Sequence, residues 1–256
     1  MSDMTTSSKY PPLSSITAMI LAGGKGTRLR PVIGNHQKVI AEIAGEPFLV
    51  KLLEQLNRCG LQKVILCTGF HGNKVAERIG KRYKNMRLCY SREPRPLGTG
   101  GALRFAFDHI DSETVLILNG DSYFSADLRE IWIWHKDKSA LHTVVLAEVP
   151  DVARFGQVIV DRTQEITNFA EKGCKHGPGW INAGIYFLHR DSISTMENNQ
   201  EISIEHDVFP NLVGKGLYGY KGDGYFIDIG TPESFREVEL KFQKTEFADT
   251  EAPQNL

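Results

Sequence analysis

The sequence predicts an α/β protein with a doubly wound, mostly parallel mixed sheet and helices on both faces. Short, continuously apolar segments alternate with longer segments whose apolar residues recur at helical spacing, which is typical of strand–helix–strand units. Beyond residue 127, predicted strands follow one another closely, so this half should add antiparallel strands. A chain of 256 residues, 41% of them hydrophobic, can bury a substantial core within one compound domain.

The first half of the chain shows the clearest alternation of strands and helices. Each predicted strand is a short apolar run, and each predicted helix has apolar residues on one face. The helix that starts at Glu46 should carry Pro47 in its first turn and end at Gly60. Expected strands are 16–21, 63–68, 87–90 and 114–118; expected helices are 46–60, 73–83 and a third entered from the loop 93–101.

The second half contains fewer helices and more strands. Expected helices are 128–138, 204–213 and 232–244; expected strands are 142–149, 157–160, 165–171, 180–188, 217–221 and 225–227. We expect a single domain over residues 16–245, with halves at about 16–126 and 127–245. The polar segments 1–15 and 246–256 should form a flexible lead-in and a loose tail.

Charge and motif content argue against several kinds of partner. The formal net charge is −1, whereas binding to a nucleic-acid backbone needs a broad excess of Lys and Arg. No apolar run approaches the roughly 20 residues that cross a bilayer, and the polar start does not resemble a secretory signal. The four cysteines lack C-x-x-C spacing, and the eight histidines form no zinc motif. We expect a cytoplasmic protein with neither a nucleic-acid nor a membrane partner.

A glycine-rich loop with a cluster of cations follows the first predicted strand. Its glycines, Gly23, Gly24 and Gly26, can bring backbone N–H groups close to an oxyanion. Four positive charges fall within fourteen residues, at Lys25, Arg28, Arg30 and Lys38. The loop has neither the Gly-Lys-Ser/Thr ending of a P-loop nor the third glycine of a dinucleotide fingerprint, so it predicts a phosphate site of another type. The alternative is a glycine turn beside a solvated basic face.

Two further strand ends carry groups suited to a ligand, because open α/β sheets bind ligands at the carboxyl ends of their strands. The glycines of 98–101 enter a predicted helix, where bare backbone amides could face a phosphate or a flat ring. Asp121 follows the strand 114–118, Asp228 precedes the last helix, and both carboxylates suit Mg²⁺. Taken alone, the glycines could form a helix cap and Asp228 an ordinary turn.

The second half offers a smaller set of polar candidates. Glu171 and Lys172 end a predicted strand, where Lys172 could hold a phosphate and Glu171 a hydroxyl. Asn182 lies within an apolar strand, and a buried asparagine needs partners that a sugar's hydroxyls could supply. A structural asparagine with partners inside the protein is the alternative.

Together and in this order, these motifs resemble those of the sugar-1-phosphate nucleotidyltransferases. The similarity runs through 21–31, 45–47, 96–102, 119–121, 171–172, 182–186 and 228–233. It spans nearly the whole predicted fold and implies a Rossmann-like sheet with an added antiparallel, sugar-binding portion. One departure is Gln37, since such enzymes usually have proline before the lysine that is Lys38 here. Gln frees φ and adds a donor, which alters the expected reach of that lysine.

The resemblance implies a role for each matching residue. Arg28, Lys38 and Lys172 would be the catalytic cations, and Asp121 and Asp228 would hold Mg²⁺. The residues implied in binding the nucleotide are Leu21, Ala22, Gly23, Gly24, Lys25, Gly26, Thr27, Gly98, Thr99 and Gly100. Those implied in binding the sugar phosphate are Gly156, Glu171, Lys172, Asn182 and Thr231.

The implied activity is nucleotidyl transfer from a nucleoside triphosphate to a sugar 1-phosphate, with release of pyrophosphate. The Pro-Leu-Gly-Thr-Gly-Gly-Ala form and the short chain are most similar to guanylyltransferases of bacterial surface-polysaccharide pathways that use GTP and D-glycero-α-D-manno-heptose 1-phosphate. Relatives that combine dTTP, UTP or CTP with glucose, mannose or N-acetyl-sugar phosphates share most of the motifs. A non-catalytic nucleotide or sugar-phosphate sensor is the alternative of another class, and Leu29 disfavours a dinucleotide-dependent oxidoreductase. The sequence leaves open whether the protein forms a homo-oligomer.

Overall fold

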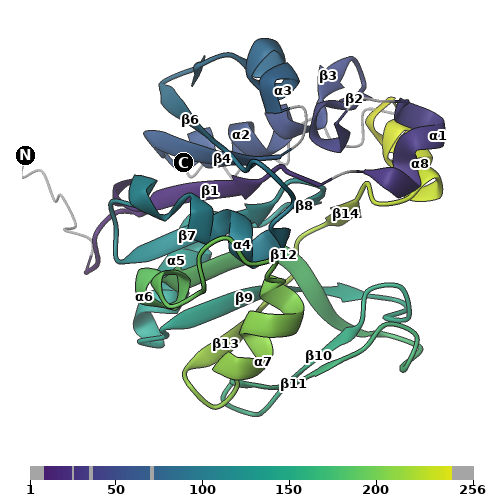
Figure 1. The fold of residues 1–256 in the computed structure, drawn as a ribbon. Helices are drawn as coiled ribbons and strands as arrows, with labels where there is room; N and C mark the ends of the chain where they lie inside the picture. Colours follow the sequence, from purple (N-terminus) through teal and green to yellow (C-terminus); the bar gives the residue numbers. More distant parts are fainter. Residues whose placement is uncertain (1–8, 25, 35–36, 70–71, 244–256) are drawn as a thin grey trace, which may run out of the picture.

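An eight-stranded mixed sheet runs through the middle of the protein (Figure 1). The computed structural model describes residues 9–24, 26–34, 37–69 and 72–243; the predictions for 1–8 and 246–256 lie outside this range. The strand order is β13-β9-β12-β7-β1-β4-β6-β5. The strands are β1 (Thr17–Leu21), β4 (Lys63–Thr68), β5 (Arg82–Tyr83), β6 (Met86–Arg92), β7 (Thr114–Asn119), β9 (His142–Val149), β12 (Gly179–His189) and β13 (Leu217–Gly222).

Parallel pairing in the middle of the sheet accompanies strands that are apolar on both sides. β1 pairs in parallel with β4 and β7, and β4 pairs in parallel with β6. In β4, residues 64–68 are all buried, as a strand covered on both faces requires. β12 joins antiparallel to β7 and β9, so strands of the second half extend the parallel sheet. The predicted fold class is confirmed.

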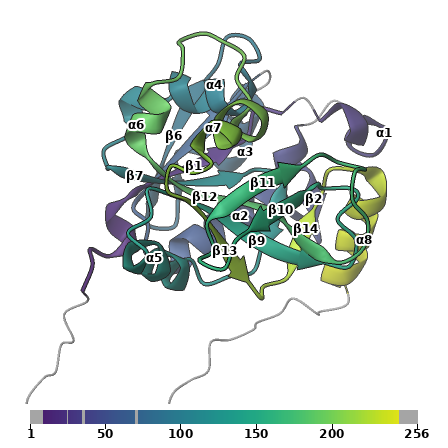
Figure 2. The ribbon, with the colours of Figure 1, turned by 90° about the horizontal axis from the view of Figure 1, so that it is seen from below.

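Helices cover both faces of the sheet. In β7, Leu116 and Leu118 face a core that includes residues of α2 and α5, whereas Val115 and Ile117 face a core with residues of α4, α6 and α7. Figure 2 shows α4 and α6 on one side of the sheet and α5 on the other. The helices are α1 (Arg30–Ile33), α2 (Phe48–Arg58), α3 (Gly72–Ile79), α4 (Gly98–Phe105), α5 (Leu128–Asp137), α6 (Arg190–Ser194), α7 (Phe209–Leu212) and α8 (Pro232–Gln243).

Short elements complete the described fold, and some of them position the site. The two-stranded sheets are β2 (Glu42–Ile43) with β3 (Glu46–Pro47), β8 (Ser122–Phe124) with β14 (Phe226–Asp228), and β10 (Gln157–Val160) with β11 (Ile166–Ala170). Turns of 3-10 helix lie at Leu13–Ser15, Thr27–Leu29, Lys38–Ile40 and Phe107–His109, and a π-helix lies at Ile204–Val208.

Two helices differ from their predicted bounds for local reasons. Pro47 belongs to strand β3 and is the N-cap of α2, so the helix begins one residue later than a first-turn proline would place it. The helix predicted to reach residue 83 ends at Ile79. Gly80 there adopts a φ of 83°, and the chain turns into strand β5.

The helix predicted over 204–213 is divided into a π-helix and α7. Pro210 lies in the first turn of α7 and has no N–H to donate to the preceding turn. A proline at this place therefore accounts for the change in helical pitch, and the π-helix places Glu205 and His206 in a cavity described below.

Residues 9–15, expected to be part of a flexible lead-in, pack against α5. Leu13 is 3% exposed, and the indole Nε1 of Trp132 donates to the carbonyl oxygen of Pro11 at 2.8 Å. The Tyr10 hydroxyl donates to Asp137 at 2.7 Å. The polar composition of the segment concealed this anchoring.

Two buried histidines predict a loss of stability in mild acid. Burial lowers the pKa of His135 to about 3 and that of His142 to about 4. In an unfolded chain, histidine has a pKa of about 6.5. The unfolded state therefore takes up protons below about pH 6.5, and the folded state does so only near pH 4 and below. The contribution to stability is complete above pH 6.5 and is lost as the pH falls.

Urea unfolding should show this dependence, with about 2 kcal/mol of unfolding free energy lost per histidine at pH 5 relative to neutral pH. In His142→Gln, about half of the drop should disappear, because one of the two groups no longer titrates. The control His176→Gln, at an exposed position, should keep the wild-type drop. Equal pH dependence in wild type and His142→Gln would contradict this account.

Candidate active site

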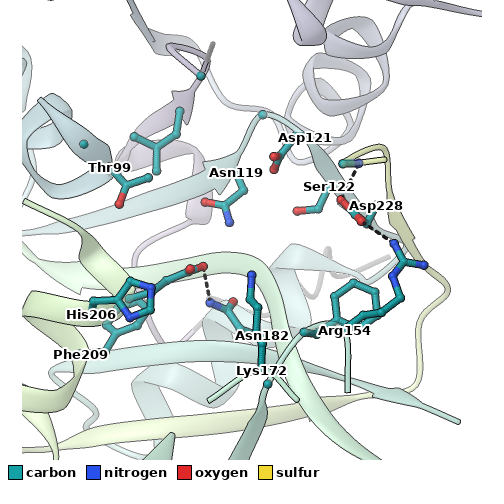
Figure 3. A pocket seen from close by; sticks show the side chains of 18 of the residues that line it. Thr99, Asn119, Asp121, Ser122, Arg154, Lys172, Asn182, His206, Phe209 and Asp228 are labelled. Atoms are coloured by element: carbon teal, nitrogen blue, oxygen red, sulfur yellow. Dashed lines mark hydrogen bonds and ion pairs between the residues drawn. The ribbon is translucent and has the colours of Figure 1, made fainter. Parts of the chain in front are cut away.

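A cavity of about 940 Å³ opens at the carboxyl ends of β1, β6 and β7 (Figure 3). Its wall combines the glycine loop after β1, the acidic turn after β7, the β10–β11 hairpin and the turn after β14. Candidates from both halves of the chain therefore meet in one space. The predicted residues on its wall are Leu21, Gly23, Gly24, Arg28, Lys38, Gly98, Thr99, Asp121, Gly156, Glu171, Lys172, Asn182, Asp228 and Thr231.

Lys38 and Asp121 form an ion pair on the first-half side of the cavity. Lys38 Nζ donates to Asp121 Oδ2 at 2.9 Å, with the lysine side chain only 11% exposed. Gly120 brings this aspartate close to the glycine loop, because its N–H donates to the carbonyl of Leu21 at 2.9 Å. A Cβ on Gly120 would lie 2.5 Å from that carbonyl oxygen. Only glycine allows this approach without displacing backbone.

Asp228 lies beside Asp121 because β14 pairs with β8. Asp228 is opposite Ser122 in this pairing, and the N–H of Ile229 donates to the carbonyl of Asp121 at 3.0 Å. Burial, and then the negative charge of Asp121, raise the pKa of the Asp228 carboxyl. The N–H of Gly230 donates to Asp228 Oδ1 at 2.8 Å. Two carboxylates from distant parts of the chain thus share one wall.

This donor set fits the predicted magnesium site. Carboxylate oxygens are hard ligands, and Mg²⁺ is commonly held by one or two carboxylates together with substrate phosphates. The repulsion between Asp121 and Asp228 would be relieved by a bound cation. Among the described residues, no group of three or more His, Cys, Asp or Glu could hold a metal. Mg²⁺ commonly completes its coordination with substrate phosphates and water.

Some residues of the predicted glycine loop lie away from the cavity. Ala22 is 1% exposed, and its N–H donates to the carbonyl of Cys67 at 2.8 Å. Gly26 adopts a φ of 56° and its carbonyl accepts from Leu29 at 3.0 Å. Both residues hold the backbone of the loop in place without facing the cavity. Lys25 and the side chains of Thr27 and Arg30 lie outside the described structure.

Of the glycines of 98–101, Gly98 lies on the cavity wall, whereas Gly100 and Gly101 pack against another segment. They are the first residues of α4, and the N–H groups of Gly100 and Gly101 donate to the carbonyl of Ile202 at 2.8 and 3.3 Å. A Cβ on Gly100 would lie 2.7 Å from Ile202 Cγ2. Gly100 is therefore a packing residue, and its amide is not free for a ligand. Thr99 lines the cavity, but its hydroxyl accepts from Ile204 at 2.8 Å.

Glu171 and Lys172 enter the cavity from the end of the β10–β11 hairpin. Gly156, the residue directly before β10, adopts a φ of 81°. A Cβ at this position would lie 2.6 Å from the carbonyl oxygen of Ala170. This close approach fixes the hairpin base under the cavity. Thr231 is also on the wall, where its hydroxyl accepts from the N–H of Ser234 at the start of α8.

Asn182 has the internal partners that its burial requires. Its Nδ2 donates to Tyr186 Oη at 2.9 Å and to Glu205 Oε1 at 3.2 Å, and its Oδ1 accepts from Gly184 at 2.8 Å. These three hydrogen bonds are the ones expected of a structural asparagine, the alternative given for Asn182 in the sequence analysis. The same side chain also forms part of the cavity wall.

Several polar residues of the wall were not among the predicted site residues, including Glu93, Arg154, Glu205 and His206. Burial raises the pKa of Glu93, whose Oε2 accepts from the N–H of Leu97 at 3.2 Å. Arg154 Nη2 lies 3.3 Å from Asp228 Oδ2. Glu205 and His206 come from the π-helix, a conformation frequent at functional sites. Pro210 was the one available sequence signal for that helix.

The paired cations and carboxylates around this cavity, at the strand ends of an α/β sheet, suit phosphorylated ligands. The chain belongs to the nucleotidyl transferase family, whose family model matches residues 17–245. It is 37% identical over 227 residues to the D-glycero-α-D-manno-heptose 1-phosphate guanylyltransferase of Aneurinibacillus thermoaerophilus, covering 88% of this chain and 98% of that protein.

Other similar proteins are also guanylyltransferases or carry a related fold. The mannose-1-phosphate guanylyltransferase of Mycobacterium tuberculosis is 35% identical, and the match covers 86% of this chain and 62% of that longer protein. The crystal structure of HddC from Yersinia pseudotuberculosis has a TM-score of 0.80 and 33% identity, covering 89% of this chain and 99% of that chain. HddC has also been solved in complex with GMP-PN. Among the described helices of this chain, none has the length and apolar character needed to cross a membrane.

The packing role of the α4 glycines predicts a specific stability loss. In Gly101→Ala, the new Cβ would lie 2.5 Å from the carbonyl oxygen of Gln200, so backbone must shift at a cost of about 1–3 kcal/mol. Gly24→Ala is the matched control, because no atom lies within 4 Å of its Cβ position. Urea unfolding at neutral pH measures both. Equal stability of the two variants would contradict the packing role.

Proposed function

We propose that the protein transfers a guanylyl group from GTP to a sugar 1-phosphate, with D-glycero-α-D-manno-heptose 1-phosphate as the preferred acceptor. The observation that carries the proposal is a single cavity whose wall holds the Lys38–Asp121 pair from the first half and Asp228 and Lys172 from the second (Figure 3). Two phosphorylated substrates that enter this cavity would meet beside the two carboxylates.

In this reaction the protein mainly has to position the two substrates and neutralise their negative charge. An oxygen of the sugar phosphate attacks the α-phosphorus of GTP, the bond from that phosphorus to the α–β bridging oxygen breaks, and pyrophosphate leaves. The second pKa of a phosphate monoester is about 6, so the nucleophile is an anion at neutral pH and needs no general base. Holding two polyanions in line and offsetting their charge are the main demands.

The cations on the wall suit these demands. Lys38 is nearly buried and held by Asp121, so it can present a fixed charge to the triphosphate. Arg28 is exposed at the glycine loop and would add a second charge there. Lys172 would hold the attacking phosphate from the hairpin side. Gly24 leaves room for a phosphate beside the backbone, because no atom lies within 4 Å of its Cβ position.

Asp121 and Asp228 would hold Mg²⁺, together with phosphate oxygens and water. When bound, the ion supplies positive charge at the reacting phosphates. The protein's own contribution is to keep the two carboxylates side by side through the β8–β14 pairing. Lys38 keeps the Asp121 carboxylate oriented toward the cavity.

The relatives support the choice of base and sugar. Those of Aneurinibacillus thermoaerophilus and Mycobacterium tuberculosis are both named as guanylyltransferases, and HddC was solved with GMP-PN. The chain matches 98% of the heptose 1-phosphate enzyme but only 62% of the mannose 1-phosphate enzyme. Agreement over nearly the full length favours the heptose phosphate.

A substrate matrix tests the proposal. The protein with Mg²⁺ is assayed for pyrophosphate release with GTP, ATP, UTP, CTP and dTTP, each against the 1-phosphates of heptose, mannose, glucose and N-acetylglucosamine. The expected result is the highest kcat/KM for GTP with the heptose phosphate. Absence of pyrophosphate from every pair would overturn the proposal and favour a sensor that binds without turnover.

Two substitutions test the charged centre. Asp121→Asn and Lys38→Ala should each lower kcat by at least about 100-fold, the size of one lost electrostatic contact in the transition state. Their urea midpoints should stay near that of the wild type, because Asp121 is half exposed and its partner is a single side chain. The control Lys175→Ala removes an exposed cation and should keep full activity. Near-normal kcat in both test variants would refute the assigned roles.

A further inference from the structure

Arg154 is a cation of the cavity wall that the proposed roles leave unassigned. It lies just before β10, and its Nη2 is 3.3 Å from Asp228 Oδ2. Figure 3 shows its guanidinium directed at Asp228 from the same side of the cavity as Lys172. Among the described residues, Asp121 forms an ion pair with Lys38 and Asp228 forms one with Arg154, and the charge of Lys38 also acts on Asp228.

The two pairs differ in how firmly the cation is held. The Lys38 side chain is 11% exposed, whereas that of Arg154 is 52% exposed. The guanidinium of Arg154 lies 5.1 Å from the ring centre of Phe155, which packs edge-on against Phe226 at 5.5 Å. Because the ion pair with Asp228 is partly exposed to solvent, the guanidinium can leave Asp228 at a small cost in free energy.

The hairpin base couples Arg154 to Lys172. Arg154 precedes β10 and Lys172 follows β11, and these strands pair in antiparallel fashion. The N–H of Gly173 donates to the carbonyl of Ala153 at 2.9 Å, which links the residue before Arg154 to the residue after Lys172. Two cations thus enter the cavity from one small structural unit. A phosphate dianion is the ligand that such a pair suits.

We propose that Arg154 is a second ligand of the attacking sugar phosphate and that Asp228 holds it only while metal and substrate are absent. This inference rests on the proposed function. A divalent cation at Asp228 repels the guanidinium, and the incoming phosphate attracts it. The planar guanidinium can donate two parallel hydrogen bonds to phosphate oxygens. Loading of the site therefore exchanges one ion pair for another, and metal and sugar phosphate promote each other's binding.

Substrate kinetics test the first part of the proposal. In Arg154→Ala, the KM for the sugar 1-phosphate should rise about 10- to 100-fold, as expected for a lost charge-assisted contact, and the KM for GTP should change by less than about threefold. Arg154→Lys should recover part of the loss, because it keeps the charge without the planar pair of donors. The control Arg162→Ala removes an exposed arginine at the far end of the same hairpin.

Metal binding without substrates tests the exchange itself. Calorimetric titration with Mn²⁺ should show about two- to fivefold tighter binding to Arg154→Ala than to wild type, because a partly exposed competing ion pair has been removed. Arg162→Ala should bind Mn²⁺ like the wild type. Unchanged or weaker Mn²⁺ binding in Arg154→Ala would overturn the exchange, and an unchanged sugar-phosphate KM would overturn the contact.

Failure of the Arg154 proposal can be distinguished from failure of the proposed function. If wild-type protein releases no pyrophosphate with any substrate pair, the proposed function fails. Calorimetric binding of the sugar 1-phosphate, with Mg²⁺ and a non-hydrolysable GTP analogue present, then still compares wild type with Arg154→Ala. If wild type is active but neither the sugar-phosphate KM nor the Mn²⁺ affinity responds to Arg154→Ala, this inference alone fails.

Discussion

The site depends on two like-charged carboxylates held side by side where β8 meets β14. Asp121 precedes β8, Asp228 ends β14, and their backbones are tied by a hydrogen bond from Ile229 to Asp121. Burial, and then the negative charge of Asp121, raise the pKa of the Asp228 carboxyl, as expected for two carboxylates that repel each other. Lys38 and Arg154 offset such repulsion in this structure. The same arrangement suits the proposed divalent cation and, through the two cations, the proposed phosphates.

Buried hydrogen bonds connect the two halves of the cavity. The Tyr186 hydroxyl in β12 accepts from Asn119 at the end of β7 and from Asn182 in its own strand. Burial raises the pKa of this hydroxyl well above its ordinary value, so it stays protonated. Asn182 continues the chain of contacts to Glu205 in the π-helix. The Tyr186 side chain therefore fixes the position of the turn after β7 relative to the part of the cavity wall that the second half of the chain contributes.

Much of the fold and part of the site could be predicted from the sequence. Apolar runs such as 64–67 and 115–118 identify strands covered on both faces, and the strand-end rule then places Asp121 and the glycine loop together. Asp228 was predicted as a partner of Asp121, and the β8–β14 pairing brings the two together. The order of the motifs along the chain predicted that Asp121 and Asp228 act together, which no local sequence pattern could indicate.

Other features depend on contacts that a linear pattern does not contain. Gly100 looked like a ligand-facing residue, but Ile202 arrives from a hundred residues away and packs on it. Arg154 stands in an unremarkable loop, and its importance arises only from its distance to Asp228. Glu205 reaches the cavity from a π-helix, although its segment has ordinary helical spacing in the sequence. Each case needed tertiary structure to resolve.

The central claim is that both substrates occupy one cavity and that the sugar phosphate attacks the α-phosphorus directly. The stereochemical course with GTP made chiral at that phosphorus by sulfur substitution is the most direct measurement. A single in-line displacement between neighbouring substrates predicts inversion of configuration in the nucleotide sugar. Retention would require two successive displacements through a covalent enzyme intermediate and would contradict the account.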